Sequence, residues 1–166
     1  MTISGPDLRQ SWGAGGARVV ALRVHELRPP NLMSQGARLK IDLELEFFPA
    51  LIAKVCKEND VVPRIFVGVR VDSRQGVVLF DLTNSVDGPD ELKIDALSDS
   101  SAVVSIDCAM PTLGAGDYFL TPGIAVGSVD HLVPLWSCDN AAMITIEAGQ
   151  TVLGLMKPEF TVRRIG

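Results

Sequence analysis

The strictest constraint on the fold is the alternation of apolar and polar residues over residues 37–48. Apolar side chains occupy every second position of this segment, and charged side chains fill the positions between them. The apolar set is Leu39, Ile41, Leu43, Leu45 and Phe47, and the charged set is Arg38, Lys40, Asp42, Glu44 and Glu46. Successive side chains of a β-strand point to opposite faces, so this period of two predicts a strand with one buried face. Such strands are typical of antiparallel sheets.

The same period returns over residues 64–72. One face carries Ile65, Val67, Val69 and Val71, and the other carries Arg64, Phe66, Gly68, Arg70 and Asp72. Residues 73–76 are short enough to turn this strand into a second one at 77–83. The connection at 49–60 is longer and has room for one helical turn.

Five further segments are rich in β-branched residues and end at Gly, Pro, Asn or Asp: residues 18–27, 102–110, 117–126, 142–147 and 159–165. About eight strands without intervening helices predict an all-β fold, an antiparallel β-sandwich of immunoglobulin-like or jelly-roll type. We expect the polar stretch 85–100 to connect its two sheets. The Gly-rich residues 1–16 predict a flexible leader, and residues 17–166 the single sandwich domain.

Composition excludes several classes of function. No apolar run approaches the roughly 20 residues that cross a bilayer. Fifteen Lys and Arg against 20 Asp and Glu give a net charge of -5, which argues against nucleic acid as a partner. The three cysteines lack Cys-x-x-Cys spacing, so we expect buried, reduced thiols.

The sequence lacks the residue patterns that usually bind a catalytic metal or a nucleotide. The two histidines form no cluster with cysteine, so no catalytic metal and no cofactor is expected, while a structural calcium on loop oxygens stays open. The run Gly13-Ala14-Gly15-Gly16 lacks the Lys and the hydroxyl of a phosphate-binding loop. This part of the chain therefore carries no nucleotide-hydrolysing motif.

Several motifs follow one another in an order that points to a family. They are Val71-Asp72, Gly76, a strand ending at Thr83-Asn84, Gly116-Asp117-Tyr118-Phe119-Leu120, Asp139-Asn140 before an apolar strand, Gly154 and Phe160. In this order they resemble the C-terminal domain of the nucleotide-binding subunit (Wzt type) of O-antigen ABC exporters, over residues 16–165. One departure is Thr83-Asn84 where the family has Asn-Thr.

The resemblance implies a non-catalytic carbohydrate-binding module. Such a module recognises the non-reducing terminus of a lipid-linked O-antigen polysaccharide in the cytoplasm, peripheral to the inner membrane, and presents it for export. The ATPase would be a separate domain, and the membrane subunit of the transporter a partner through the parent protein. A glycosyltransferase parent stays open. The family also implies a homodimer, for which exchange of residues 159–165 is the expected device because an unpaired sheet edge invites pairing.

Two places are candidates for sugar contact. If 64–72, 77–83 and 117–126 share a sheet, its outer face carries Phe66, Arg70, Asp72, Asp81, Phe119 and Thr121. Rings and planar polar groups suit sugars, although a solvated sheet face carries the same charges. The second candidate is a loop with His131 and Trp136, where the Trp ring either stacks on a sugar or fills the core. We interpret Tyr118 as structural, with its hydroxyl reaching back to the preceding loop.

Two other classes of function stay open. A glycan-modifying enzyme on a jelly-roll scaffold could use Asp72 and Asp81 if they lie about 5–10 Å apart. Ser137, His131 and Asp130 could form a triad only if their geometry allowed it. A protein-interaction β-sandwich would instead dock a partner on an exposed edge strand.

Overall fold

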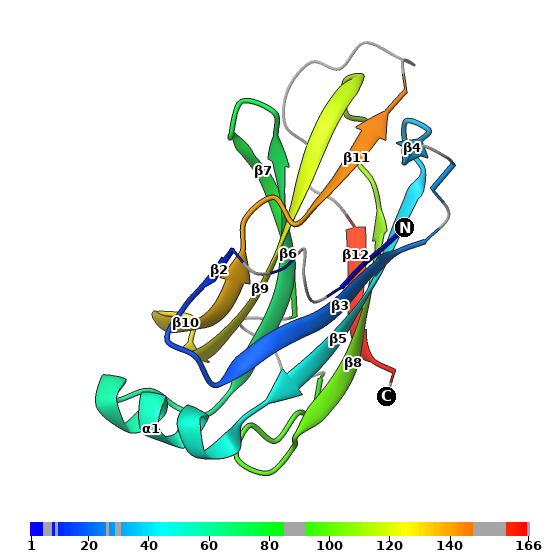
Figure 1. Cartoon of the computed structure of the whole chain (residues 1–166). Helices are drawn as coiled ribbons and strands as arrows, with labels where there is room; N and C mark the ends of the chain where they lie inside the picture. Colours follow the sequence, from blue (N-terminus) through cyan, green and yellow to red (C-terminus); the bar gives the residue numbers. More distant parts are fainter. Residues whose placement is uncertain are drawn as a thin grey trace.

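Two β-sheets pack face to face in the computed structural model, which describes residues 1–4, 8, 10–25, 27–28, 31–84, 92–147 and 159–165 (Figure 1). The first sheet has the order β1-β3-β5-β8-β12. Its strands are β1 (Thr2–Ser4), β3 (Ala17–Val24), β5 (Arg38–Phe47), β8 (Ser101–Ala109) and β12 (Glu159–Arg164). All of its pairs are antiparallel. The predicted all-β antiparallel sandwich is confirmed.

The second sheet is built around the 13-residue strand β9 (Gly116–Ser128). One edge of β9 pairs with β6 (Ile65–Ser73), which in turn pairs with β7 (Val78–Thr83). The other edge is shared by β10 (His131–Cys138) and β11 (Ala142–Ile146). The short strands β2 (Ser11–Trp12) and β4 (Leu32–Met33) extend β10 and β11, and β4 runs parallel to β11. The predicted sharing of one sheet by β6, β7 and β9 is thus confirmed.

The core follows the predicted alternation. On β5, the apolar positions Leu39, Ile41 and Leu43 have no solvent exposure, while the charged positions between them are partly exposed. The apolar positions of β6 behave in the same way. The three cysteines are free and buried, as expected. The polar connection after β7 crosses to the first sheet at β8, and its residues 85–91 lie outside the described residues.

The connection after β5 differs from the prediction. It holds α1 (Pro49–Asn59), an 11-residue helix, where one helical turn was expected. Pro49 begins the helix, and Asp60 ends it in the left-handed conformation. The helix buries Ile52 and Val55, whose spacing of three is the helical period that the sequence interpretation missed.

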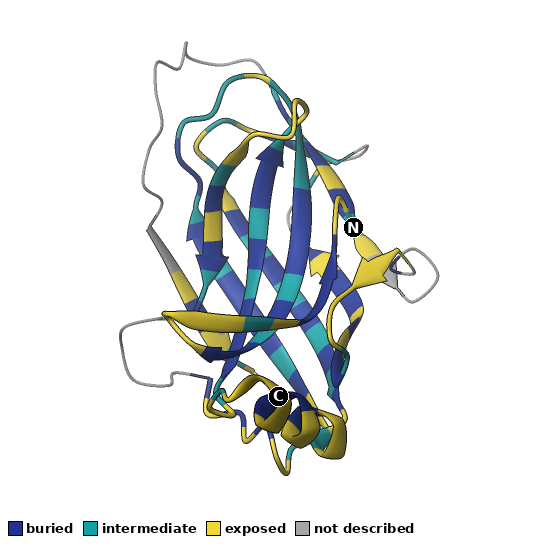
Figure 2. Cartoon of the chain, turned by 90° about the vertical axis from the view of Figure 1, so that its left-hand side faces the viewer, coloured by how far each residue is buried: buried dark blue, intermediate teal, exposed yellow. Residues whose placement is uncertain are grey.

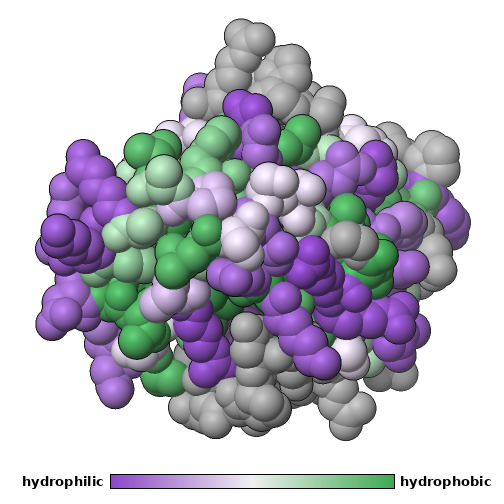
Figure 3. All heavy atoms as spheres, turned by 90° about the horizontal axis from the view of Figure 1, so that it is seen from below, coloured by the Kyte–Doolittle hydropathy of each residue, from purple (hydrophilic) through white to green (hydrophobic). Residues whose placement is uncertain are grey.

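The helix lies across one end of the sandwich, with most of its surface exposed (Figure 2). Seen from this end, hydrophobic residues gather on one side of the surface and hydrophilic residues cover much of the rest (Figure 3). Within the described part of the chain, no helix is long and apolar enough to cross a bilayer.

The predicted loop around His131 and Trp136 is wrong, because these residues belong to β10. The strand contains Pro134, and its register shifts between Pro134 and Trp136. A proline and a bulge both interrupt the alternation by which a strand is recognised in sequence.

The segment predicted as a flexible leader contributes to both sheets. Thr2–Ser4 pairs with β3, and Ser11–Trp12 pairs with β10. At the other end of the chain, β12 pairs with β8 of the same chain. The residues that lead into β12, 148–158, lie outside the described residues, as does Gly154 of the motif series. Exchange of β12 between two copies stays a prediction.

Candidate functional site

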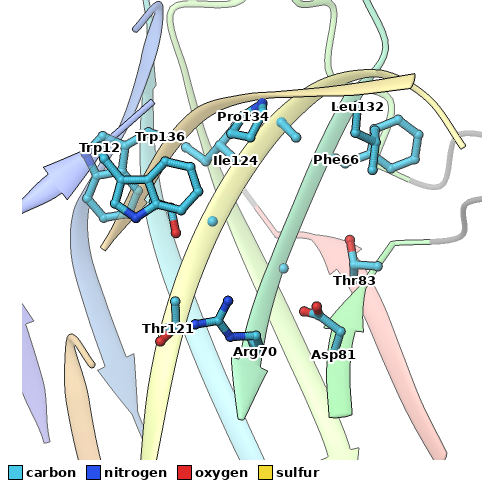
Figure 4. A pocket seen from close by; sticks show the side chains of 14 residues that line it. Trp12, Phe66, Arg70, Asp81, Thr83, Thr121, Ile124, Leu132, Pro134 and Trp136 are labelled. Carbon is cyan, nitrogen blue, oxygen red and sulfur yellow. The ribbon is translucent and has the colours of Figure 1, made fainter. Parts of the chain in front are cut away.

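The outer face of the second sheet contains a pocket of about 260 Å³ (Figure 4). Strands β2, β6, β7, β9 and β10 supply its walls. The lining residues are Trp12, Phe66, Gly68, Arg70, Asp81, Thr83, Thr121, Gly123, Ile124, Ala125, Leu132, Pro134, Trp136 and Ser137.

The floor of the pocket is a pair of glycines. Gly68 of β6 lies opposite Gly123 of β9, at the middle of the sheet. A Cβ at Gly68 would lie 2.9 Å from the Leu82 carbonyl oxygen, so the approach of β7 requires glycine there. A Cβ at Gly123 would meet nothing closer than 3.8 Å. Nothing within the described chain therefore requires glycine at 123, and the missing side chain leaves the hollow open.

The cross-strand register places polar residues on one side of this floor and apolar residues on the other. Arg70 pairs with both Thr121 and Asp81 on the polar side. On the apolar side Ala125 pairs with both Phe66 and Pro134. Figure 4 shows the same division, with Arg70, Thr121 and Asp81 at one end and the Phe66 ring at the other.

Arg70 is fixed by a network of carboxylates. Its Nε donates to both oxygens of Asp72, at 2.9 and 3.0 Å, and its Nη2 donates to Asp139 at 3.3 Å. The Thr121 hydroxyl donates to Asp72 at 3.2 Å and accepts from the backbone N–H of Asn140 at 3.0 Å. Asp72 is only 4% exposed, so it acts from beneath the pocket and orients Arg70.

Asp81 is different, because no hydrogen bond or ion pair joins it to the described residues. Burial raises the pKa of its carboxyl, and the charge of Asp72 raises it further, while Arg70 lowers it. The Asp81 residue is exposed on β7, and its carboxylate offers acceptor oxygens at the rim of the pocket.

Aromatic rings supply the apolar part of the wall. Trp12 is half exposed, and its Nε1 donates to Asp139 at 3.2 Å. Trp136 is buried, belongs to the core, and also lines the pocket. The Arg64 guanidinium lies 5.1 Å from the centre of the Phe66 ring. Of these rings Trp12 alone is exposed, and an exposed ring beside fixed polar groups is a surface on which the C–H face of a sugar can rest.

Trp12 reaches the pocket because the glycine-rich segment after it is bound to β10. The N–H of Ala14 donates to the Pro134 carbonyl, and the N–H of Gly15 donates to the Leu135 carbonyl, both at 2.9 Å. Gly13 has a φ of 139°, and a Cβ there would lie 2.4 Å from the Leu135 oxygen. Only glycine fits this contact.

The structure brings most of the predicted site residues together. Phe66, Arg70, Asp81, Thr121 and Trp136 line the pocket, and Asp72 lies beneath it. Phe119 lies opposite Asp72 in register, outside the lining. His131 is exposed at the start of β10 and also lies outside the lining.

The sequence interpretation missed the glycine pair and Trp12. A tryptophan directly before the run Gly13-Ala14-Gly15-Gly16 was the available signal, since a large ring is unusual in a flexible leader. Tyr118 behaves as predicted, because its hydroxyl donates to the Gly114 carbonyl at 2.8 Å.

The serine and histidine considered for a triad lie apart on β10, and the buried Asp72 is held by Arg70. Ser137 donates to the Pro122 carbonyl at 3.4 Å, and His131 lies six residues away on the same strand, about 20 Å at the rise of a strand. Asp72 is buried and bonded to Arg70. Among the described residues, no three His, Cys, Asp or Glu side chains are placed to hold a metal ion.

Comparison with known proteins identifies the family. The crystal structure of the C-terminal domain of Wzt has a TM-score of 0.64 to this chain, at 16% identity, covering 88% of this chain and 82% of that one. CopC from Methylosinus trichosporium OB3b covers 80% of this chain and 99% of its own at 12% identity, with a TM-score of only 0.32. No curated protein matches the chain. The family model of the Wzt C-terminal domain matches residues 9–158. The chain therefore belongs to the Wzt C-terminal domain family.

Proposed function

We propose that this domain is a non-catalytic carbohydrate-binding module that holds the non-reducing terminus of a lipid-linked O-antigen polysaccharide in the pocket on its second sheet. The family membership supports the export context. The single observation that carries the proposal is the open glycine floor between a fixed guanidinium and an apolar wall with the half-exposed Trp12 ring. A sugar ring has an apolar C–H face and a rim of hydroxyls, which matches this division.

The wider setting belongs to the same proposal. The domain acts in the cytoplasm, at the inner membrane, through a parent protein that contacts the transporter's membrane subunit. A homodimer would carry two such pockets and bind a polymer with greater avidity than one domain alone. Light scattering of the purified domain tests the dimer independently of the sugar.

Calorimetric titration with the delipidated O-polysaccharide of the source strain tests the binding. Trp12→Ala removes a half-exposed ring from the pocket wall, and we expect about tenfold weaker binding. Trp12→Phe keeps a ring and should retain part of the affinity. Phe48→Ala is the matched control, because Phe48 is also an exposed ring and lies outside the pocket.

Two results would refute the proposal. One is the absence of binding by the unaltered domain at millimolar concentrations of polysaccharide. The other is wild-type affinity in Trp12→Ala, which would move any binding away from this pocket. Turnover of the polysaccharide by the isolated domain would contradict the non-catalytic part.

A further inference from the structure

The turn between β10 and β11 lies at the middle of the second sheet. Both strands pair with the same edge of β9, and Thr121 lies between the two paired stretches. Asn140 of this turn has a left-handed φ of 53°, which asparagine adopts more readily than most residues. Its backbone N–H donates to the Thr121 hydroxyl at 3.0 Å. The turn is therefore anchored to a residue that lines the pocket.

Asp139, the first residue of this turn, binds two residues of the pocket wall at once. Its Oδ2 accepts from Trp12 Nε1 at 3.2 Å, and its Oδ1 accepts from Arg70 Nη2 at 3.3 Å. Trp12 and Arg70 come from β2 and β6, and both line the pocket (Figure 4). Asp139 itself is not among the lining residues. One carboxylate outside the lining thus bridges the exposed ring and the guanidinium.

The two bridged side chains depend on Asp139 in different ways. The β2 backbone pairs with β10 over only two residues, and the half-exposed Trp12 ring has a single donor, which Asp139 accepts. Arg70 is also held by Asp72, which accepts from its Nε. With Nε and Nη2 bound to two carboxylates, the plane of the guanidinium is fixed. Its Nη1 has no partner within the described residues, which leaves it for a ligand oxygen.

We infer that Asp139 is a positioning residue, which holds Trp12 and Arg70 in the arrangement that receives the sugar. This inference rests on the proposed function, since it concerns the same pocket. The pair with Arg70 is exposed, with 51% of the Asp139 side chain in solvent, and exposed ion pairs contribute little to stability. The contribution of Asp139 is instead to order two side chains before the ligand arrives, which reduces the entropy lost on binding.

Nuclear magnetic resonance tests the bridge without a ligand. The chain has two tryptophans, so the ¹⁵N-labelled domain gives two indole N–H signals, and Trp12→Phe identifies the one from Trp12. Asp139→Ala should move this signal upfield, because the N–H loses its carboxylate acceptor. Asp107→Ala is the matched control, since it also removes an aspartate that pairs with a surface arginine, Arg38 at 2.8 Å, on the first sheet. It should leave the signal in place.

Titration with the O-polysaccharide tests the consequence for binding. Asp139→Ala should weaken binding about three- to tenfold, because the ligand must then order both side chains itself. Asp139→Asn keeps one acceptor oxygen of the two, so it can hold only one of the donors and should give an intermediate affinity. In a Trp12→Ala background the ring is already gone, so Asp139→Ala should have a smaller effect than in the unaltered domain. Asp107→Ala should bind like the unaltered domain.

The outcomes separate the inference from the proposed function. An unmoved Trp12 signal, or wild-type affinity in Asp139→Ala, overturns the inference and leaves glycan binding standing. An undiminished effect of Asp139→Ala in the Trp12→Ala background also overturns it, because Asp139 would then not act through the ring. Absence of binding by the unaltered domain overturns the proposed function instead, while the resonance measurement needs no ligand and reports on the bridge alone.

Discussion

Gly123→Ala fills the pocket floor from below without disturbing the fold. The added methyl group would lie 3.8 Å from its nearest neighbours, the Ser137 Oγ and the Trp136 carbonyl oxygen, which is ordinary contact. Residue 123 lies in β9 and is not among the glycines with positive φ. The folded chain therefore accepts alanine here without strain.

Gly123→Ala should raise the stability of the domain and weaken its binding of the ligand. Replacing Gly by Ala at a compatible position raises the free energy of unfolding by about 0.4–1 kcal/mol, because the unfolded chain loses freedom. For a domain of this size that is about 1–4 °C in Tm. A methyl group in a filled pocket costs about 1–3 kcal/mol of binding free energy, or about 5- to 150-fold in Kd.

Thermal unfolding and calorimetric titration of the same preparation check both signs. Gly114→Ala is the matched control, because its Cβ would also make only a 3.8 Å contact, with the Tyr118 hydroxyl, outside the pocket. It should show a similar gain in Tm with unchanged affinity. Wild-type affinity in Gly123→Ala, or a loss of stability, would refute the reasoning that the glycine floor exists for a ligand.

Four further predictions follow from the packing and the charges. Gly13→Ala should lower the free energy of unfolding in urea by at least about 2 kcal/mol and weaken glycan binding, because it forces apart the contact that positions Trp12. Asn84→Ala should cost about 2–4 kcal/mol in the same assay, since its buried amide satisfies two backbone groups of β6. Asp81→Asn should raise Tm only slightly at pH 7, because Asp81 is exposed and the desolvation that raises the pKa of its carboxyl is partial; the gain should vanish below about pH 3.9, where the unfolded carboxyl is also protonated. Burial raises the pKa of Cys108 to about 11, so iodoacetamide at pH 8 should modify it only as fast as the domain unfolds.

The sandwich could be predicted because the alternation of apolar and polar residues along its strands shows which side chains are buried. Residues 38–47 alternate without a break, and each apolar position is buried as expected. The same period places Phe66, Arg70 and Thr121 on one outer face, which the register of β6 against β9 confirms. A period of two fixes which side chains share a face, and this holds for the candidate site as well as for the core.

The remaining parts of the site depend on contacts that no local pattern reveals. β10 escaped recognition because Pro134 and the bulge interrupt its alternation. Trp12 could not be predicted because β2 is only two residues long and shows no period. Its partner residues in β10 lie more than 120 residues later in the chain. The glycine pair needed the register of β6 against β9, which follows from the assembled sheet.

Three features that the fold itself does not need lie around the same pocket. Position 123 has room for a side chain and carries none, Asp81 lines the pocket without a hydrogen bond or ion pair to the described residues, and Trp12 keeps half its surface in water. A sequence selected for stability alone would remove each of them, because each has a simple stabilising substitution. Their occurrence around the same 260 Å³ of space is explained by a ligand that fills the floor, donates to the carboxylate and covers the ring. Local features that only an occupant makes useful thus support binding separately from the family membership.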